Sequence, residues 1–285
     1  MRPSTESRRS TFHCPRCGHL ISYRAQSCLY CKLPRPGFVA NIPILKELLH
    51  GEIRFGEGIF ITIIALYFAA ILLDIGGSLR TGGLFGMLAP SSASLYRLGM
   101  GGEIPWNMGR WWTLLTTTYL HGGLLHIAFN LMWLRSIGPL VEELFGRSRF
   151  FVIYTLAGVG GVALSTLLGT PFTVGASGSI FGLLAALIFY GRSRGGTFGS
   201  GIMRSMLIYA GIGLLFGLLA PNVDNWGHVG GFVTGFLAAL WLGYEEKSKQ
   251  TLTHHLLAFA FLFFVLVCFT IMVVLFFTSP VLPPA

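Results

Sequence analysis

The sequence predicts an all-α polytopic membrane protein that carries a small cysteine-containing domain at its N-terminus. Three observations support this class. Of the 285 residues, 53% are hydrophobic and 11% are charged, whereas a soluble domain carries about 25% charged residues. The apolar residues gather in long uninterrupted stretches, without the strict alternation that is typical of barrel strands. Four of the five cysteines form two Cys-x-x-Cys pairs near the start of the chain.

The apolar stretches are close to the length that a helix needs to cross a bilayer, about 20 residues. Backbone polar groups in lipid are satisfied only within helices or closed barrels, so we interpret each stretch as a helix. The stretches are 59–75, 114–137, 150–168, 174–190, 202–220, 226–244 and 256–277. We therefore expect seven membrane helices.

The distribution of Lys and Arg predicts the orientation of these helices. Basic residues gather before the first stretch and in the second-to-third, fourth-to-fifth and sixth-to-seventh connections, while 169–173 and 221–225 contain none. The long 76–110 connection is an exception, and long loops are weaker indicators. We expect the membrane to be a bacterial inner (plasma) membrane. Because cytoplasmic loops carry the excess of positive charge, we expect the N-terminus on its cytoplasmic side. This placement also argues against nucleic acid as the partner behind the formal net charge of +9.

Three of the expected helices carry unusual polar residues at the same, outer end. His126 and Asn130 lie four residues apart on one face of the second helix, Ser177 opens the fourth and His228 opens the sixth. Ionisable groups inside a membrane span are rare and indicate function. The short fourth helix is about 21 Å long, so Ser177 would lie about 9 Å inside a hydrocarbon layer about 30 Å thick. We therefore expect a wet cavity, lined by protein, around these side chains.

Glycine spacing predicts that the fourth and sixth helices approach each other closely. Gly178 and Gly182 are four residues apart on the fourth helix, and Gly227, Gly231 and Gly235 form a ridge on the sixth. Small residues at this spacing allow close backbone approach between membrane helices. A serine and an imidazole need such an approach, because proton transfer requires a separation of about 3 Å.

Together these motifs resemble the rhomboid family of intramembrane proteases. The matching pieces are, in chain order, His121 with His-Ile-Ala-Phe-Asn at 126–130, Val-Glu-Glu-Leu-Phe-Gly at 141–146, Gly-Ala-Ser-Gly at 175–178, and Gly-His at 227–228 with Gly231 and Gly235. The likeness covers about 59–244. It implies a six-helix rhomboid core, here followed by an additional transmembrane helix. It also implies serine endopeptidase activity through a Ser–His dyad, with no cofactor for catalysis and with single-span transmembrane proteins in the lipid bilayer as substrates.

The resemblance also assigns roles to individual residues. Ser177 would be the nucleophile and His228 its base, and cleavage would occur near the outer leaflet. His126, Asn130 and the Ser177 backbone N–H would stabilise the oxyanion. The supporting residues would be His121, Gly175, Gly178, Phe181 and Gly231.

The chain departs from the family pattern at two places. Many members have Trp-Arg before the second helix, whereas this chain has Trp-Trp-Thr at 111–113 with Arg110 upstream. This difference leaves open how the first outer loop is anchored. Phe181 stands where some members have a tyrosine that stacks on the histidine, so the ring is retained without its hydroxyl.

Each of these side chains also has a purely structural interpretation. Ser177 could cap a helix N-terminus, and His228 could be a packed histidine bonded to a carbonyl. His121 could act directly or support the outer end of the second helix. Asp224 lies four residues before His228 and is interpreted as a solvated loop residue, with an orienting role as the alternative.

Two other functional classes compete with a protease. The first is a membrane protein that binds client helices without cleaving them, against which the retained serine and histidine argue. The second is a small-solute transporter, which predicts inverted repeats and charged residues at the membrane midplane. Neither feature is evident in the sequence.

The N-terminal cysteines predict a zinc-ribbon-like domain. Cys14, Cys17, Cys28 and Cys31 offer four thiolates, a set suited to a tetrahedral structural Zn²⁺. Redox or disulfide use is the alternative, which a cytoplasmic location disfavours. We expect this domain over 1–36, a linker over 37–57, the core over 58–245 and the additional helix with a short tail over 246–285. An unknown cytoplasmic partner of the small domain is a further expectation.

Overall fold

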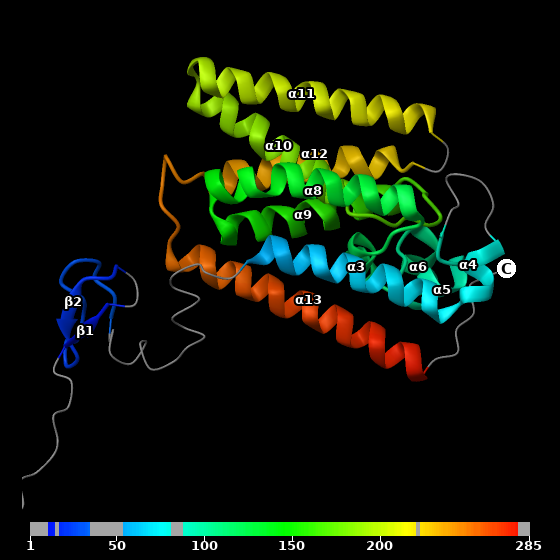
Figure 1. Ribbon diagram of the computed structural model, residues 1–285, viewed down its shortest axis with the longest axis horizontal. Helices are drawn as coiled ribbons and strands as arrows, with labels where there is room; N and C mark the ends of the chain where they lie inside the picture. Colours follow the sequence, from blue (N-terminus) through cyan, green and yellow to red (C-terminus); the bar gives the residue numbers. More distant parts are fainter. Residues whose placement is uncertain (1–10, 15–16, 35–53, 81–87, 221–222, 279–285) are drawn as a thin grey trace, which may run out of the picture. The chain divides into compact units, whose positions relative to one another are not determined.

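The computed structural model describes residues 11–14, 17–34, 54–80, 88–220 and 223–278 (Figure 1). The chain divides into two compact units, Met1–Ile53 and Arg54–Ala285. The boundary falls inside the predicted linker.

The first unit is built around a short antiparallel hairpin. Strand β1 (Thr11–His13) pairs with β2 (Leu20–Ser22), with Phe12 opposite Ile21. Its small core consists of Cys14, Ile21, Cys28 and Leu33. So few buried side chains cannot offset the entropy of ordering the chain, so we expect a metal to contribute to folding.

The second unit is helical in the part of the chain that the structure describes, which confirms the predicted all-α class. Its elements are α3 (Phe55–Leu73), α4 (Ile75–Arg80), α5 (Ser92–Arg97), α6 (Glu103–Asn107), α7 (Thr113–Thr116), η1 (Thr117–Tyr119), α8 (Leu124–Phe145), α9 (Arg147–Leu167), α10 (Ser177–Arg194), α11 (Gly196–Leu219), α12 (Asn225–Leu242) and α13 (Leu252–Thr278).

Five of these helices, α3, α8, α9, α11 and α13, are long and apolar enough to cross a membrane. The chain is therefore a multi-pass membrane protein. The count of seven spans stays a prediction, because α10 and α12 are helices of 18 residues that are not among the five. Both of these helices begin with glycine and polar residues, which lowers their apolar character.

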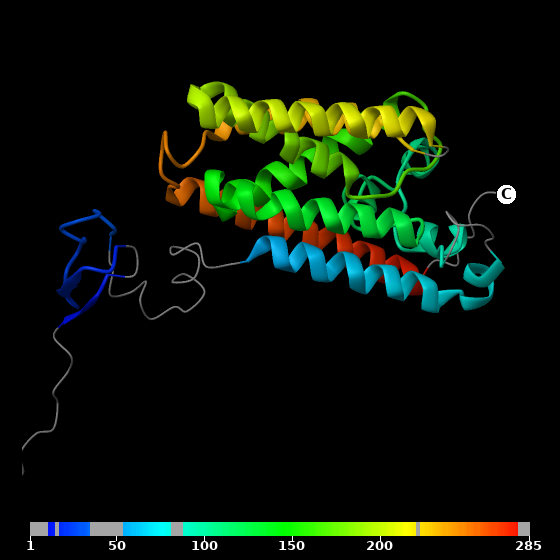
Figure 2. The ribbon, with the colours of Figure 1, turned by 45° about the horizontal axis from the view of Figure 1, so that its top comes forward.

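Three helices form the centre of the second unit. Helices α9, α10 and α12 pack against one another, and α11 covers α10 (Figures 1 and 2). On the other side, α3 packs against α8, and α13 packs against α9. In α9, 67% of the apolar window is buried, against 22% or less in α3, α11 and α13, so the polar residues of α10 and α12 lie beside the most buried of the five candidate spans.

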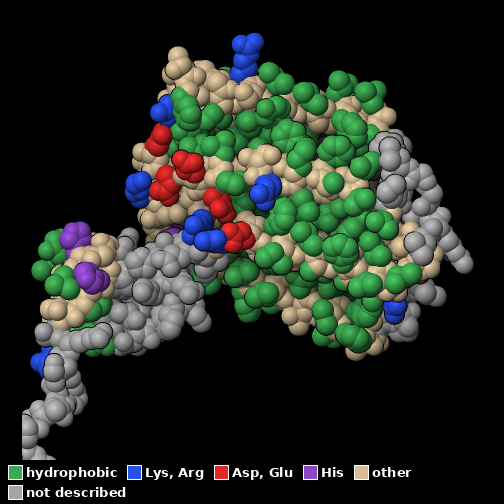
Figure 3. Space-filling view, in the orientation of Figure 1, with side chains coloured by type: hydrophobic (Ala, Val, Ile, Leu, Met, Phe, Trp, Pro, Cys, Tyr) green, Lys and Arg blue, Asp and Glu red, His purple; other side chains and the backbone are tan. Residues whose placement is uncertain are grey.

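The surface of the second unit is suited to lipid. Hydrophobic side chains cover much of the face shown in Figure 3, and charged side chains gather at its left end, where α8 ends and α9 and α13 begin. Leu218, Leu219 and Phe277 are 76%, 78% and 80% exposed, which would be unfavourable in water. Apolar helix faces bounded by a charged end are expected where hydrocarbon meets the aqueous layer.

The structure corrects the predicted start of the second membrane helix. The stretch 114–137 was expected to be one helix, but α7 and η1 end at Tyr119 and α8 begins only at Leu124. The Thr116 hydroxyl donates to the Gly99 carbonyl, and the Thr117 hydroxyl donates to the Thr173 carbonyl. Threonines bound to other segments, followed by two glycines, do not continue the helix.

Candidate active site

Ser177 is the first residue of α10 and follows a turn that only glycine fits. Gly175 has φ +130°, in the region that favours glycine. A Cβ atom added to it would lie 2.7 Å from His126 Nε2, so the imidazole packs directly against the turn. The Gly175 N–H donates to the Thr117 carbonyl at 3.1 Å, which holds the turn on the segment before α8. Ser177 and His126 are therefore close in space, although they are far apart in the sequence.

Helix α8 contributes His126 and Asn130. The Gly122 N–H faces His126 Nδ1 at 3.4 Å, so Nδ1 is the acceptor and Nε2 carries the proton toward the turn at Gly175. Asn130 is buried and donates through Nδ2 to the His126 carbonyl at 2.8 Å. An amide NH₂ has two hydrogens, so Asn130 retains one for another acceptor.

His121 is fully buried in the segment that precedes α8. Its ring lies 5.0 Å from that of His126, and its Nε2 lies 3.5 Å from the backbone nitrogen of Ala176. These contacts place His121 against the turn before Ser177. The geometry favours a supporting role, which was one of the two interpretations considered from the sequence.

His228 lies in the first turn of α12 and is held from two sides. Its ring stacks on Phe181, with centroids 4.2 Å apart and planes 10° apart. Phe181 is one helical turn after Ser177, so the imidazole lies against the face of α10 that carries the serine. In the described part of the chain no hydrogen bond joins the Ser177 hydroxyl to His228, and such bonds often tighten only when substrate binds.

The orientation of His228 is set by Asn225, a residue that the sequence analysis did not single out. His228 Nδ1 lies 3.2 Å from Asn225 Oδ1, which can only accept, so Nδ1 carries the proton. Asn225 Nδ2 faces the Leu214 carbonyl at 3.5 Å, consistent with this amide orientation. Nε2 of His228 is thus left with its lone pair, the form that a general base needs. The three-residue spacing between Asn225 and His228, which places both in one helical turn, is the feature of the sequence that could have indicated this contact.

The glycines bring α10 and α12 into backbone contact, which confirms the close approach predicted from their spacing. A Cβ atom on Gly231 would meet the carbonyl oxygen of Gly178, and one on Gly235 would meet the backbone of Gly182. On the other side, a Cβ atom on Gly161 of α9 would meet the Gly227 carbonyl oxygen. The first turns of α10 and α12 are therefore fixed relative to each other by backbone atoms rather than by flexible side chains.

Asp224 is a structural clamp, so its interpretation as a solvated loop residue is wrong. Its carboxylate caps α12 by accepting from the Gly227 N–H at 2.9 Å. It also accepts from the hydroxyl of Ser165 on α9 and, at 2.7 Å, from the hydroxyl of Thr173. These three bonds tie the start of α12 to α9 and to the loop before α10, the two segments that flank Ser177.

We expect Asp224→Ala to lower the free energy of unfolding by about 2 kcal/mol, because it removes a helix cap and leaves two hydroxyls without their acceptor. The shift in unfolding midpoint in detergent micelles measures this. The Ser165→Ala/Thr173→Val double variant should lose less and, combined with Asp224→Ala, should add little further loss. Additive losses would show that the three side chains do not act as one cluster.

The loop between α3 and α8 is anchored through Arg110, which answers the question left by the missing Trp-Arg motif. The Arg110 guanidinium carbon lies 4.2 Å from the centroid of the Tyr96 ring, and Nη2 donates to the Tyr96 carbonyl at 2.9 Å. Arg110 thus holds α5 beside the segment that leads to His121. The position of Arg110 could not be predicted from the sequence, because its partner lies 14 residues earlier in a short helix.

The four N-terminal cysteines form a cluster that could hold a metal ion. Their sulfur atoms all lie within 4.8 Å of one another, with Cys14–Cys31 at 3.7 Å and Cys17–Cys28 at 3.6 Å. A tetrahedron of thiolates at a Zn–S distance of about 2.3 Å has edges of about 3.8 Å, whereas a disulfide measures about 2.05 Å. The backbone N–H of Cys31 lowers the pKa of the Cys28 thiol to about 6, which favours the thiolate that a metal binds, whereas burial raises the pKa of the Cys31 thiol to about 12.

Comparison with known proteins identifies the family. Residues 108–245 match the Rhomboid domain. Rhomboid protease GluP of Bacillus subtilis is 41% identical over 140 residues, which cover 49% of this chain and 28% of GluP. RHOMBOID-like protein 2 of Arabidopsis thaliana is 33% identical over 186 residues, 61% of this chain and 56% of that protein. YdcA, a rhomboid protein of Bacillus subtilis, is 30% identical over 145 residues, which cover 50% of this chain and 72% of YdcA.

The chain belongs to the rhomboid family. This confirms the resemblance that the sequence motifs indicated. The matched region of this rhomboid contains Ser177, His228, His126 and Asn130, and the cysteine cluster lies outside it. The chain spans 28% of GluP and 56% of RHOMBOID-like protein 2.

Proposed function

We propose that this rhomboid is an intramembrane serine endopeptidase that cleaves single-span transmembrane proteins near the outer leaflet. The observation that carries the proposal is that Ser177 opens α10 one helical turn before Phe181, the ring on which a histidine of α12 stacks. His228 stacks on Phe181, and Asn225 Oδ1 accepts from its Nδ1–H, which leaves Nε2 unprotonated. Membership of the rhomboid family and its likeness to Rhomboid protease GluP support the same activity.

The chemistry follows from these positions. Ser177 Oγ attacks the scissile carbonyl carbon while His228 Nε2 takes the hydroxyl proton, because an unactivated serine is a weak nucleophile. The C–N bond of the tetrahedral intermediate then breaks, and the proton passes from His228 to the leaving amine. A water molecule, deprotonated by the same nitrogen, attacks the acyl-enzyme, and the proton returns to Ser177 as the carboxylic acid product leaves.

Three donors are available to the oxyanion that forms in each half of this reaction. The Nε2–H of His126 is directed to the turn before Ser177, Asn130 retains one amide hydrogen, and the Ser177 backbone N–H, the first of α10, has no acceptor within its own helix. The positive end of the helix macrodipole adds to this field. Donors that are already oriented when charge develops supply the largest catalytic effect in acyl transfer.

A small cavity beside the serine supports hydrolysis. It has a volume of about 20 Å³, and its lining includes Ser177, Thr173 and Asp224. A polar cavity needs at least about 10–15 Å³ to hold one water molecule. A single water could therefore be held next to the acyl-enzyme in a segment otherwise surrounded by apolar side chains.

The decisive experiment uses the full chain in proteoliposomes with a model single-span substrate and a fluorophosphonate probe. We expect the wild type to cleave the substrate at a membrane-embedded or interfacial bond and to be labelled by the probe at Ser177. Ser179→Ala is the matched control, because Ser179 points toward Gly158 of α9 and its variant should retain both signals. A wild type that neither cleaves nor labels would favour a protein that only binds client helices.

We further propose that the N-terminal cysteine cluster holds a structural Zn²⁺ and that this unit lies in the cytoplasm of a bacterium, beneath the inner membrane. The charge distribution of the loops supports this orientation. The turns at the two Cys-x-x-Cys pairs are equivalent, since Gly18 and Lys32 each donate to the carbonyl of the first cysteine at 2.9 Å. A partner for this unit in the cytoplasm remains a proposal drawn from its sequence.

The zinc proposal predicts one Zn²⁺ per chain and loss of structure when it is removed. Binding to four thiolates contributes about 10–16 kcal/mol to folding, which a core of four side chains cannot replace. Elemental analysis should therefore find zinc in the wild type and none in Cys14→Ser, and limited proteolysis should then cut within the first unit. Cys268→Ser, the matched control in α13, should keep its zinc. Full zinc content in Cys14→Ser would contradict the assignment.

A further inference from the structure

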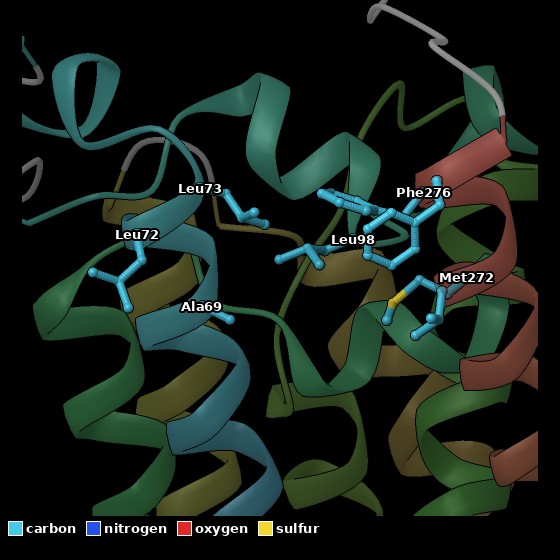
Figure 4. Close-up of a pocket in the computed structure, with 8 residues that line it drawn as sticks. Ala69, Leu72, Leu73, Leu98, Met272 and Phe276 are labelled. Atoms are coloured by element: carbon cyan, nitrogen blue, oxygen red, sulfur yellow. The ribbon is translucent and has the colours of Figure 1, made fainter.

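The outer ends of α3 and α13 enclose an apolar groove that has no part in the proposed protease chemistry. The groove has a volume of about 390 Å³ and is lined by Ala69, Leu72, Leu73, Leu98, Met272, Val273, Phe276 and Phe277. The first three come from α3 and the last four from α13, and Leu98 lies between the two helices (Figure 4). The volume is in the range of sites that bind small ligands, about 300–1,000 Å³.

The position of the groove limits what can fill it. Both α3 and α13 are candidate membrane spans, so the opening between them faces hydrocarbon. All eight lining side chains are apolar, and none offers a group that would orient a polar ligand. The molecules present at highest concentration around such an opening are lipids, and an acyl chain matches its lining.

Among the side chains that the structure describes, one cation lies at the mouth of the groove. Arg97, the last residue of α5, is exposed, and its guanidinium carbon lies 4.9 Å from the centroid of the Phe276 ring. It is adjacent in sequence to Leu98, which lines the groove. Within the described ranges no carboxylate lies within ion-pair distance of Arg97. An arginine at the end of two spans, beside an acyl-sized groove, complements the phosphate of a lipid headgroup.

We propose that this groove binds an anionic phospholipid, with one acyl chain between α3 and α13 and the headgroup phosphate on Arg97. The acyl chain supplies the apolar contact that any phospholipid could make, and Arg97 supplies the preference for a net negative headgroup. One such charge near the membrane surface is expected to favour the anionic lipid about fivefold over a zwitterionic one. The proposal is independent of the protease activity, because neither Ser177 nor His228 lines the groove.

Photo-crosslinking in vesicles tests this directly. The full chain is reconstituted in equal parts of phosphatidylglycerol and phosphatidylcholine, with a trace of either lipid carrying a diazirine on its acyl chain. Labelled peptides are then mapped by mass spectrometry. We expect the phosphatidylglycerol probe to label the segments around Leu98 and Met272 about fivefold more than the phosphatidylcholine probe.

Substitutions at the mouth separate headgroup recognition from simple lipid contact. Arg97→Gln should reduce labelling by the phosphatidylglycerol probe to the level of the phosphatidylcholine probe, and Arg97→Lys should keep part of the preference. Arg192→Gln, which removes an exposed arginine at the end of α10, is the matched control and should leave the groove labelling unchanged. Ala69→Phe should reduce labelling by both probes, because it fills the groove.

Three results would overturn the proposal. Equal labelling of the wild type by both probes would show that the groove does not distinguish the two headgroups. A preference that persists in Arg97→Gln would show that this arginine does not bind the headgroup. Absence of labelling at the groove by either lipid probe, with labelling elsewhere on the chain, would show that no acyl chain enters the groove between α3 and α13.

Discussion

Replacing Ser177 with alanine is expected to abolish cleavage of a transmembrane substrate, with kcat falling by at least about 10⁴-fold. His228→Gln, which nearly preserves the size of the side chain, should cause a loss of similar magnitude. The physical reason is that neither group acts without the other: the serine hydroxyl needs a base, and without the serine no acyl-enzyme forms for an activated water molecule to hydrolyse. Initial rates in proteoliposomes, measured over a range of substrate densities, separate kcat from KM.

The double variant provides the sharper test. Because the serine and the histidine act in one step, Ser177→Ala combined with His228→Gln should be no slower than the slower single variant. Additive losses would mean that His228 contributes through packing on Phe181 rather than as a base. Phe181→Leu serves as the control for packing, since it removes the stacked ring and leaves both reacting groups in place.

Much of this site could be predicted from the sequence because the bilayer restricts its spanning segments to apolar helices of a nearly fixed length. Apolar stretches of the right length, with polar residues at one end of three of them, indicated that Ser177, His126 and His228 lie at the same level. The glycine spacing indicated which helices approach closely, and the structure confirms that α10 and α12 do. The cysteine pairs likewise predicted their own cluster.

The remainder depended on long-range contacts that a sequence does not display. Helix α8 begins ten residues later than the hydropathy indicated, because Thr116 and Thr117 bond to distant loops. Asn225 and Asp224 both resembled loop residues. The partners of Asp224 lie 51 and 59 residues away in the sequence. The role of Asn225 depends on His228, whose position in the fold had to be known first. The role of a short polar side chain can be assigned only when the fold shows which group it contacts.

Gly231→Leu is expected to separate α12 from α10 and to lower both stability and activity. Even the Cβ atom of a replacement side chain meets the Gly178 carbonyl, a backbone atom that cannot move aside without shifting its helix. Overpacking of this kind typically lowers stability by about 1–3 kcal/mol, and a displacement of about 1 Å between reacting groups lowers the rate about 100-fold. Gly231 lies three residues after His228, and Gly178 directly follows Ser177, so the shift acts on the dyad itself.

The smaller substitution Gly231→Ala distinguishes this explanation from general instability. We expect it to lower kcat about 10- to 100-fold while shifting the unfolding midpoint less than Gly231→Leu does, because geometry is affected before folding. Gly211→Ala in α11 is the matched control: no atom lies within 4 Å of its added Cβ, so it should keep full activity and gain about 0.4–1 kcal/mol. If Gly231→Ala behaves like Gly211→Ala, backbone contact between α10 and α12 does not set the distance between Ser177 and His228.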